Sequence, residues 1–254
     1  MGKSENSNGG HRDLRGQRVV VVGGTSGMGL GAVSAAADAG AEVVVAGRRP
    51  VAERAPVHPE GRRIEHAVVD AGDEVSVRAM FDAIGELDHL LVTPSPAPGS
   101  WGAFLDQDLA AARGYMDGKF FAAWACARHA APKLRAGGSI TFLTGVAAVR
   151  PRAGLAIVTA AFAAVEALAR ALALDLAPVR VNAIRPGFVD SDMWSFLDAA
   201  AREALRKKVR EAFPVRRTGA IEDIGQAAVF LMTNPYVTGA ILEVTGGEQL
   251  VDAF

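Results

Sequence analysis

Seven consecutive residues near the start of the chain have the composition of a phosphate-binding loop. They read Gly-Gly-Thr-Ser-Gly-Met-Gly, and they lie between an apolar run at 19–22 and a small-residue segment at 30–39. Glycines let the backbone approach a pyrophosphate, and the free amides of a following helix favour negative charge. This setting disfavours the alternative of a merely flexible turn. We expect a dinucleotide to bind on the following residues: Gly23, Thr25, Ser26, Gly27, Met28 and Gly29.

Two arginines follow the next apolar run, at 43–46. In proteins that bind NAD, the end of this strand carries a carboxylate that accepts hydrogen bonds from the ribose hydroxyls. No acid is present here, and Arg48 and Arg49 would form charge-assisted hydrogen bonds with a 2'-phosphate. The pair predicts NADP(H) rather than NAD(H). The alternative is that both arginines are solvated surface charges.

The elements that must position these residues alternate along the chain. Short β-branched runs predict buried strands at 19–22, 43–46, 64–69, 90–93, 140–144, 179–184 and 241–244. Segments with helical spacing lie at 27–39, 73–84, 109–134, 160–176 and 223–232. Such alternation calls for right-handed crossovers and a parallel sheet that is covered on both faces. We therefore expect an α/β fold of the Rossmann type, doubly wound.

Composition limits the domain count and the kinds of partner. Half of the 254 residues are hydrophobic, which is enough for one substantial core, so we expect a single domain over 14–254. Residues 1–13 are polar and rich in Gly, Ser and Asn, and we expect a disordered extension without a secretory signal. With 27 basic and 28 acidic side chains, the chain has no excess of positive charge that would attract nucleic acid or an anionic membrane surface.

Cysteine usage and hydropathy limit the metal sites, the cellular compartment and the membrane spans that we expect. The single cysteine, Cys126, excludes a disulfide framework and a thiolate metal site, and we expect no metal. A reducing cytoplasm fits this usage. No stretch approaches 18 apolar residues free of charge, so we expect no membrane span.

From about Leu14 to its C-terminus, the sequence resembles the short-chain dehydrogenase/reductase family. The landmarks are residues 14–16, the spaced glycines, an aspartate after the third strand, and the segments 180–187 and 239–247. The resemblance implies a seven-stranded doubly wound, mostly parallel sheet. It also implies adenine contacts after the third strand and a turn after the sixth strand that holds the nicotinamide. Read without their neighbours, these residues are a helix cap and an ordinary turn. The further cofactor positions implied are Asp70, Ala71, Thr93, Pro94, Pro186, Gly187, Val189 and Ser191.

The departures from the family pattern concern catalysis. The family's catalytic serine falls on Gly145, and its Tyr-x-x-x-Lys pair falls on Val158 and Phe162. Its active-site asparagine falls on Lys119. Valine and phenylalanine have no ionisable proton, and removing a positioned acid costs about 10²- to 10⁴-fold in rate. We expect ordinary carbonyl reduction by the family's usual route to be lost.

Four residues are candidates to replace the missing catalytic groups. Tyr115 and Lys119 are spaced i, i+4, so on a helix they share a face. An ammonium beside Val158 and Phe162 would have a lowered pKa, and it would be a better acid or base near neutrality. Thr144, and likewise Thr159, could hydrogen-bond a carbonyl without titrating. The alternative is that Lys119 reaches solvent or an interface and Tyr115 only packs.

Residues 192–217, which correspond to the family's mobile lid, carry apolar side chains among many basic ones. They predict either a site for a hydrophobic substrate bearing an acid or a solvated amphipathic helix. The alanine-rich helices at 109–134 and 160–176 resemble the helices that the family uses for contacts between subunits, so we expect a homodimer or homotetramer.

Three functions remain open: an NADP(H)-dependent oxidoreductase with a relocated acid, a protein that only binds or senses the cofactor, and a non-redox biosynthetic enzyme.

Overall fold

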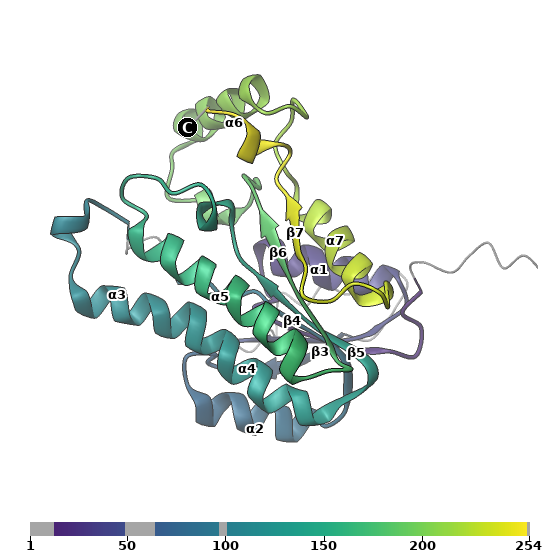
Figure 1. Cartoon of the computed structure of the whole chain (residues 1–254). Coiled ribbons are helices and arrows are strands. Elements are labelled where there is room, and N and C mark those ends of the chain that lie inside the picture. The colour runs from purple at the N-terminus through teal and green to yellow at the C-terminus, as the bar shows by residue number, and fades with distance from the viewer. Residues whose placement is uncertain (1–12, 49–63, 97–100, 253–254) are drawn as a thin grey trace, which may run out of the picture.

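The structure is a computed structural model that describes residues 13–48, 64–96 and 101–252. The expectation of a disordered extension over residues 1–13 lies outside these ranges except for Asp13, and the predicted phosphate contact of Arg49 lies outside them as well. Seven strands and the helices between them form one layered body (Figure 1).

The seven strands make one parallel sheet. They are β1 (Arg18–Val22), β2 (Glu42–Gly47), β3 (Ile64–Val68), β4 (Leu87–Val92), β5 (Leu134–Leu143), β6 (Arg180–Pro186) and β7 (Ile241–Val244). Their order is β3-β2-β1-β4-β5-β6-β7. After β3 the chain crosses to the other side of β1, so the strand order changes direction between β1 and β4. In sheets of this kind, ligands bind beyond the carboxyl ends of the strands at that position. The expected seven-stranded Rossmann-type sheet is confirmed.

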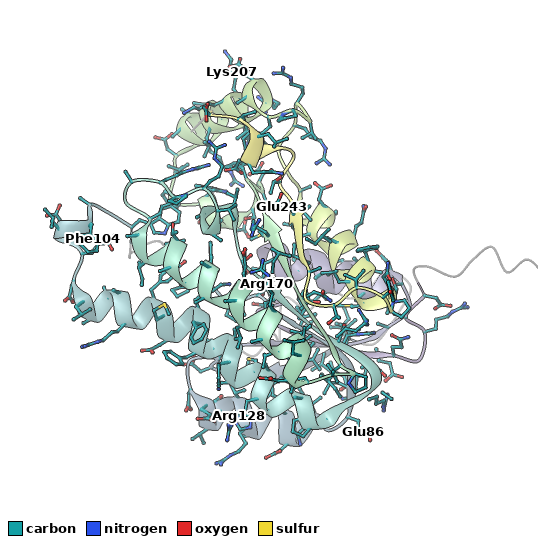
Figure 2. All side chains as sticks on the ribbon, in the orientation of Figure 1. Glu86, Phe104, Arg128, Arg170, Lys207 and Glu243 are labelled. Atoms are coloured by element: carbon teal, nitrogen blue, oxygen red, sulfur yellow. The ribbon has the colours of Figure 1, made fainter. Side chains whose placement is uncertain are left out.

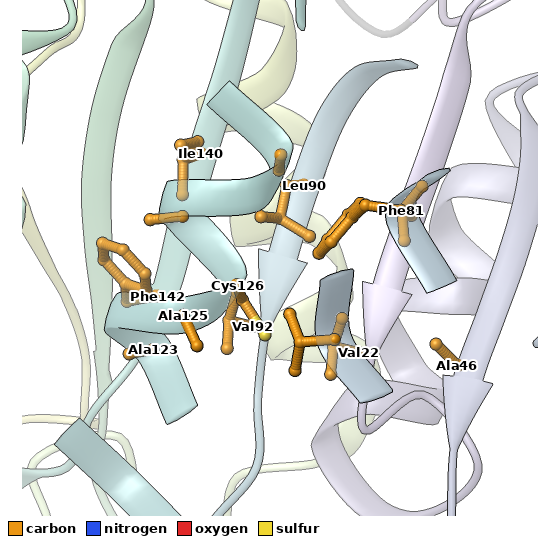
Figure 3. Packing of buried hydrophobic residues seen from close by; sticks show 14 of the residues in the cluster. Val22, Ala46, Phe81, Leu90, Val92, Ala123, Ala125, Cys126, Ile140 and Phe142 are labelled. Carbon is orange, nitrogen blue, oxygen red and sulfur yellow. The ribbon is translucent and has the colours of Figure 1, made fainter. Parts of the chain in front are cut away.

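Alternation along each strand builds two cores, one on either face of the sheet. Val20 and Val22 of β1 lie in a cluster with side chains of α2 (Glu74–Ile84), α4 (Ala122–Ala130) and α5 (Ala156–Asp175). Figure 3 shows part of this cluster, where Val22, Leu90 and Phe81 lie around the sulfur of Cys126. Val19 and Val21 face the opposite cluster, formed with α1 (Gly27–Asp38) and α7 (Ile221–Thr233).

Helix α6 (Ala199–Ala212) lies beyond the carboxyl ends of β6 and β7 (Figure 1). Its polar side chains face solvent, with Lys207 at the outer edge of the molecule (Figure 2), while Val209 is fully buried. The amphipathic helix expected within residues 192–217 is observed, and the expected site for a hydrophobic substrate stays a prediction. The Asp198 side chain caps its first turn by accepting a hydrogen bond from the Ala201 amide at 2.8 Å.

One predicted helix is wrong in its extent. Residues 109–134 form α3 (Leu109–Met116), a π-helical turn η3 (Asp117–Phe121), α4 and a short 3₁₀ turn, and β5 begins already at Leu134. Gly118 is the second residue of the π-helical turn, and a Cβ there would be 2.9 Å from Cγ of Pro96. Close approach of the loop after β4 and the low helix propensity of glycine explain the irregularity.

Helix α5 has the length and hydropathy of a membrane-spanning segment, with 20 residues and a mean hydropathy of 1.8. It carries Glu166, which is buried and paired with Arg185 of β6 at 2.6 Å. Its apolar face belongs to the core cluster on one side of the sheet. We therefore interpret α5 as a core helix whose length and composition resemble those of a membrane span.

Candidate cofactor and active site

The glycine loop joins β1 to α1 at the carboxyl edge of the sheet. Its two ends pack so closely that a Cβ on Gly29 would lie 2.3 Å from the carbonyl oxygen of Gly23. The Ser26 side chain makes no capping hydrogen bond, and the first turn of α1 has no acidic residue. The first amides of α1 and its dipole are thus suited to an anion. Thr25 and Ser26 are exposed, whereas Met28 packs partly into the core.

The predicted adenine side lies at the ends of β2 and β3. The Val69 amide donates to the Gly47 carbonyl at 3.0 Å, which brings the exposed residues Arg48 and Asp70 to neighbouring strand ends. The Asp70 carboxylate accepts a hydrogen bond from the Gly72 amide at 3.0 Å, and Ala71 lies partly buried between them. Arg48 and Asp70 therefore follow neighbouring strands at this edge.

The other predicted cofactor residues lie at the ends of β4 and β6. Thr93 is buried, and its hydroxyl donates to the Val22 carbonyl at 3.0 Å beside the glycine loop. After β6, the Gly187 amide donates to Val244 at 3.1 Å, and Val189 pairs with Gly219. A Cβ on Gly27 would lie 4.0 Å from that of Ser191, so this turn adjoins the glycine loop. The described residues predicted to bind the cofactor, from Gly23 to the Pro186–Ser191 turn, therefore share one edge of the sheet.

Two of the positions to which the resemblance assigns the family's catalytic residues, Gly145 and Phe162, form an interlocking pair. A Cβ on Gly145 would lie 2.5 Å from Cε2 of Phe162, so the aromatic ring fills the space that a serine would need. Val158 is buried in a small apolar cluster with Tyr115 and Ala161, and Phe162 packs against this cluster. The replacements therefore form one packed apolar surface.

Lys119 lies in the π-helical turn and is 4% exposed. Its Nζ donates to the Pro94 carbonyl at 2.9 Å and lies 5.3 Å from the centroid of the Phe162 ring. Burial lowers the pKa of this amine from 10.5 to about 7. The ammonium and the neutral amine are therefore both populated near neutral pH, at the edge of the apolar surface of Val158 and Phe162.

Tyr115 is also buried, with its hydroxyl 3.5 Å from Oγ of Ser95. Tyr115 and Lys119 thus both contact the Pro94-Ser95 segment, although a π-helical turn separates them instead of a regular α-helix. Burial raises the pKa of Tyr115 above its usual value. The tyrosine stays protonated at neutral pH, and Lys119 is the stronger candidate for proton transfer.

The hydroxyl of Thr144 belongs to a buried polar network. It lies 3.1 Å from Oε1 of Glu166 and 3.1 Å from the Ile184 carbonyl. Glu166 accepts two hydrogen bonds from Arg185, which also pairs with Glu243 at the upper end of β7 (Figure 2). Thr144 therefore supports this network. The buried Thr159 hydroxyl has no hydrogen-bond partner among the described residues.

Asp190 binds two of the basic residues of the lid. Its carboxylate accepts from Arg202 at 2.8 Å and from Arg206 at 2.6 Å, and these arginines hold its pKa below the usual value. These two cations thus have a carboxylate partner within the protein, which argues against using them for a substrate acid. Within the described residues, no three His, Cys, Asp or Glu side chains lie close enough to hold a metal ion.

Sequence reasoning missed two features near this edge. Glu248 is 3% exposed, and it accepts a hydrogen bond from the Phe188 amide at 2.7 Å and pairs with Arg152. Trp101, in the loop after β4, contacts the aromatic residues of the lid. The only sequence signals were an acid in the glycine-rich turn near the C-terminus and an isolated tryptophan after a proline-rich stretch.

Known proteins share this arrangement of fold and glycine loop. A family model described as enoyl-(acyl carrier protein) reductase matches residues 22–249. A short-chain dehydrogenase/reductase of an Acremonium species, ucsE, is 32% identical over 91% of this chain and 95% of its own. The chain belongs to the short-chain dehydrogenase/reductase family, whose members are oxidoreductases that use nicotinamide cofactors.

Solved structures give the same result. A small-chain dehydrogenase in complex with NADPH is 33% identical, with a TM-score of 0.78 over 92% of this chain and 99% of its own. MalC reductase/Diels-Alderase from Malbranchea aurantiaca is 25% identical, with a TM-score of 0.87 over 94% and 99% of the two chains. A short-chain oxidoreductase of Pseudomonas aeruginosa PAO1 with an atypical catalytic centre is 29% identical, with a TM-score of 0.82 over 93% and 98%.

Proposed function

We propose that this protein is an NADPH-dependent oxidoreductase in which Lys119 takes over the proton transfer of the missing tyrosine and lysine. The observation that carries the proposal is the buried amine of Lys119, beside the Phe162 ring and with a pKa of about 7. A general acid is most effective when its pKa lies near the operating pH. Lys119 meets this condition at the place where the family's acid is absent.

In the proposed reaction, the residues of the site have the following roles. When bound, NADPH supplies a hydride. The Nζ of Lys119 holds the proton that a substrate carbonyl or imine needs as it gains negative charge. The carbonyl of Pro94 orients this amine by accepting its hydrogen bond. Val158 and Phe162 exclude water, which strengthens the interaction between the ammonium and the developing charge.

The preference for NADPH over NADH is a proposal supported by charge. Arg48 is exposed at the end of β2, and Arg49 follows it in the sequence. A guanidinium forms charge-assisted, often bidentate hydrogen bonds with a phosphate. The solved relative in complex with NADPH adds support from the same family.

A second candidate is a non-redox reaction in the same pocket, or cofactor binding without turnover. Two observations favour it: the packed apolar surface at Gly145, Val158 and Phe162, and the dual name, reductase/Diels-Alderase, of one solved relative. Under this alternative the shape of the pocket matters more than its acids. NADPH then binds saturably and is not consumed.

A screen of NADPH consumption with carbonyl and imine substrates separates the candidates. Thermal stabilisation by NADPH and NADH is measured beside it, so that failure to bind is distinguished from failure to react. We expect consumption in the wild type, a loss of 10²-fold or more, by order of magnitude, in Lys119→Met, and full activity in Lys133→Met. Lys133 is a suitable control because its amine pairs with Asp82 at 2.9 Å and is remote from Phe162 in the fold. Turnover that survives in Lys119→Met would exclude the proposed role of Lys119.

We also propose a homo-oligomer, which is the expectation from the family. Apolar side chains on α4 and α5 and on the turn before α4 are exposed, and they include Phe121, Trp124 and Leu174. Association would bury such side chains. Light scattering coupled to size-exclusion chromatography should give a mass of two or four chains, and a monomer at micromolar concentration would contradict this proposal.

A further inference from the structure

Four aromatic side chains form a continuous cluster beside the candidate site. Phe188 stacks on Trp194 with ring centroids 5.0 Å apart, and Trp194 lies 6.1 Å from Phe196 and 6.4 Å from Trp101. Trp101 and Phe196 meet edge to face at 6.1 Å. We call these four residues the aromatic cluster. Its members come from two segments far apart in the sequence, the loop after β4 and the segment after β6.

The aromatic cluster is fixed to both sides of the candidate site. The indole nitrogen of Trp194 donates to the Val189 carbonyl at 3.0 Å, within the turn that adjoins the glycine loop. On the other side, the amide of Gly102, next to Trp101, donates to the Gly154 carbonyl at 3.0 Å, just before α5. The cluster therefore spans from the predicted nicotinamide turn to the start of the helix that carries Val158.

Two members of the aromatic cluster are packed beneath α6, and the other two are exposed. Phe188 is 8% exposed, and with Trp194 it packs against Val209 and Phe213 beneath α6. Trp101 and Phe196 are instead 37% and 56% exposed. Trp101 also lines a pocket of about 330 Å³ with Asp106, Ala111 and Ile157, on its side toward α3. The packing of Phe188 and Trp194 against Val209 and Phe213 already stabilises this segment, so the exposed rings of Trp101 and Phe196 are not needed for that purpose.

We propose that the substrate of this site carries a planar aromatic ring system that stacks on Trp101 and Phe196. This inference rests on the proposed function, because it places the reacting group of the same substrate toward Lys119. Aromatic rings gain a contribution from offset or edge-to-face packing that is absent for a saturated ring of similar area. A flat ring can also lie with its whole face against the exposed side of these two rings, whereas a puckered saturated ring makes fewer contacts there.

A matched pair of ligands tests the inference with the whole, NADPH-saturated protein. The probes are naphthalene-2-methanol and its fully saturated decahydro analogue, and their dissociation constants are measured by titration calorimetry. We expect the aromatic probe to bind about 3- to 10-fold more tightly than the saturated one. Trp101→Leu and Phe196→Leu should each reduce this ratio toward one, and Trp101→Phe should retain it.

Tyr236→Leu is the matched control, because Tyr236 is an aromatic residue that is 97% exposed and lies between α7 and β7. It should leave the ratio unchanged. Equal affinities of the two probes in the wild type, or a ratio that survives in both leucine variants, would overturn the inference. Because binding is measured without turnover, the preference should persist in Lys119→Met. Loss of turnover in that variant with the aromatic preference intact therefore tests the two proposals separately.

Discussion

Replacing Lys119 by methionine should stabilise the protein, and by an amount that depends on pH. The folded state lowers the pKa of Lys119 from 10.5 to about 7, whereas the unfolded chain keeps the ordinary value. Between these two pH values the unfolded state binds one proton more than the folded state, so the free energy of unfolding rises with pH. Below about pH 7 both states are protonated, and the penalty for burying the ammonium is fully present.

The size of the effect follows from the same shift. Each pKa unit corresponds to about 1.4 kcal/mol, so the full shift corresponds to about 5 kcal/mol, of which about 4 kcal/mol apply at pH 7, where half of the folded molecules carry the neutral amine. Methionine is close to lysine in shape and carries no charge, but it loses the hydrogen bond to Pro94, which is worth about 1 kcal/mol. We therefore expect Lys119→Met to be more stable than the wild type by about 3 kcal/mol at pH 7.

Urea unfolding of both proteins at several pH values from 6.5 to 9.5 measures this difference. The advantage of the variant should shrink by about 1.4 kcal/mol per pH unit above pH 7, because the wild-type amine becomes neutral in the folded state. Lys133→Met serves as the control for loss of a lysine outside the candidate site, one that pairs with Asp82. Wild-type and Lys119→Met stabilities that run parallel with pH would show that the amine titrates as a solvated lysine, and the reasoning would be refuted.

Two further predictions concern the packing behind the site. Gly145→Ser should cost about 1–3 kcal/mol of stability, because its Cβ would overlap the Phe162 ring. In a Phe162→Ala background the same change should cost less, and additive effects in a calorimetric double-mutant cycle would contradict the interlocking pair. Glu166→Leu should cost about 3–5 kcal/mol, since it leaves Arg185 buried without its bidentate partner. Combining it with Arg185→Met should recover part of the loss in denaturant unfolding, and no recovery would exclude a charge effect.

Much of the fold could be predicted because local patterns determine it. Buried parallel strands are short, β-branched runs, and the run at 241–244 coincides with β7. Strand ends were less predictable: β5 begins at Leu134 instead of Ile140, because Leu134 pairs with Leu87 of β4 before an irregular glycine-rich stretch that rejoins the ladder at Ser139. The break in the helix after Met116 was not predicted either, since the cause is the approach of Pro96 to Gly118, a contact distant in sequence.

The candidate site was predictable where it depends on spacing and not where it depends on packing. The glycine loop follows from its place in the alternating chain, and Lys119 was singled out by the resemblance to the family and by its spacing from Tyr115. The fit of the Phe162 ring against Gly145 was not visible, because the two residues lie on different elements and only the fold brings them together. The same holds for the Thr144 hydroxyl, whose partner Glu166 is an acid within an otherwise apolar helix. It holds again for Trp101, which joins the aromatic cluster across the site.

The most direct test of the account is a calorimetric titration of the full chain with NADPH and with NADH at pH 7.5. We predict one nucleotide per chain, and NADPH should bind at least about tenfold more tightly than NADH, because charge-assisted hydrogen bonds to the 2'-phosphate add to those on the pyrophosphate. Arg48→Glu should remove most of this preference while retaining NADH binding. The absence of binding heat for either nucleotide, confirmed by unchanged thermal stability, would contradict the central claim that this edge of the sheet holds an NADP(H) cofactor.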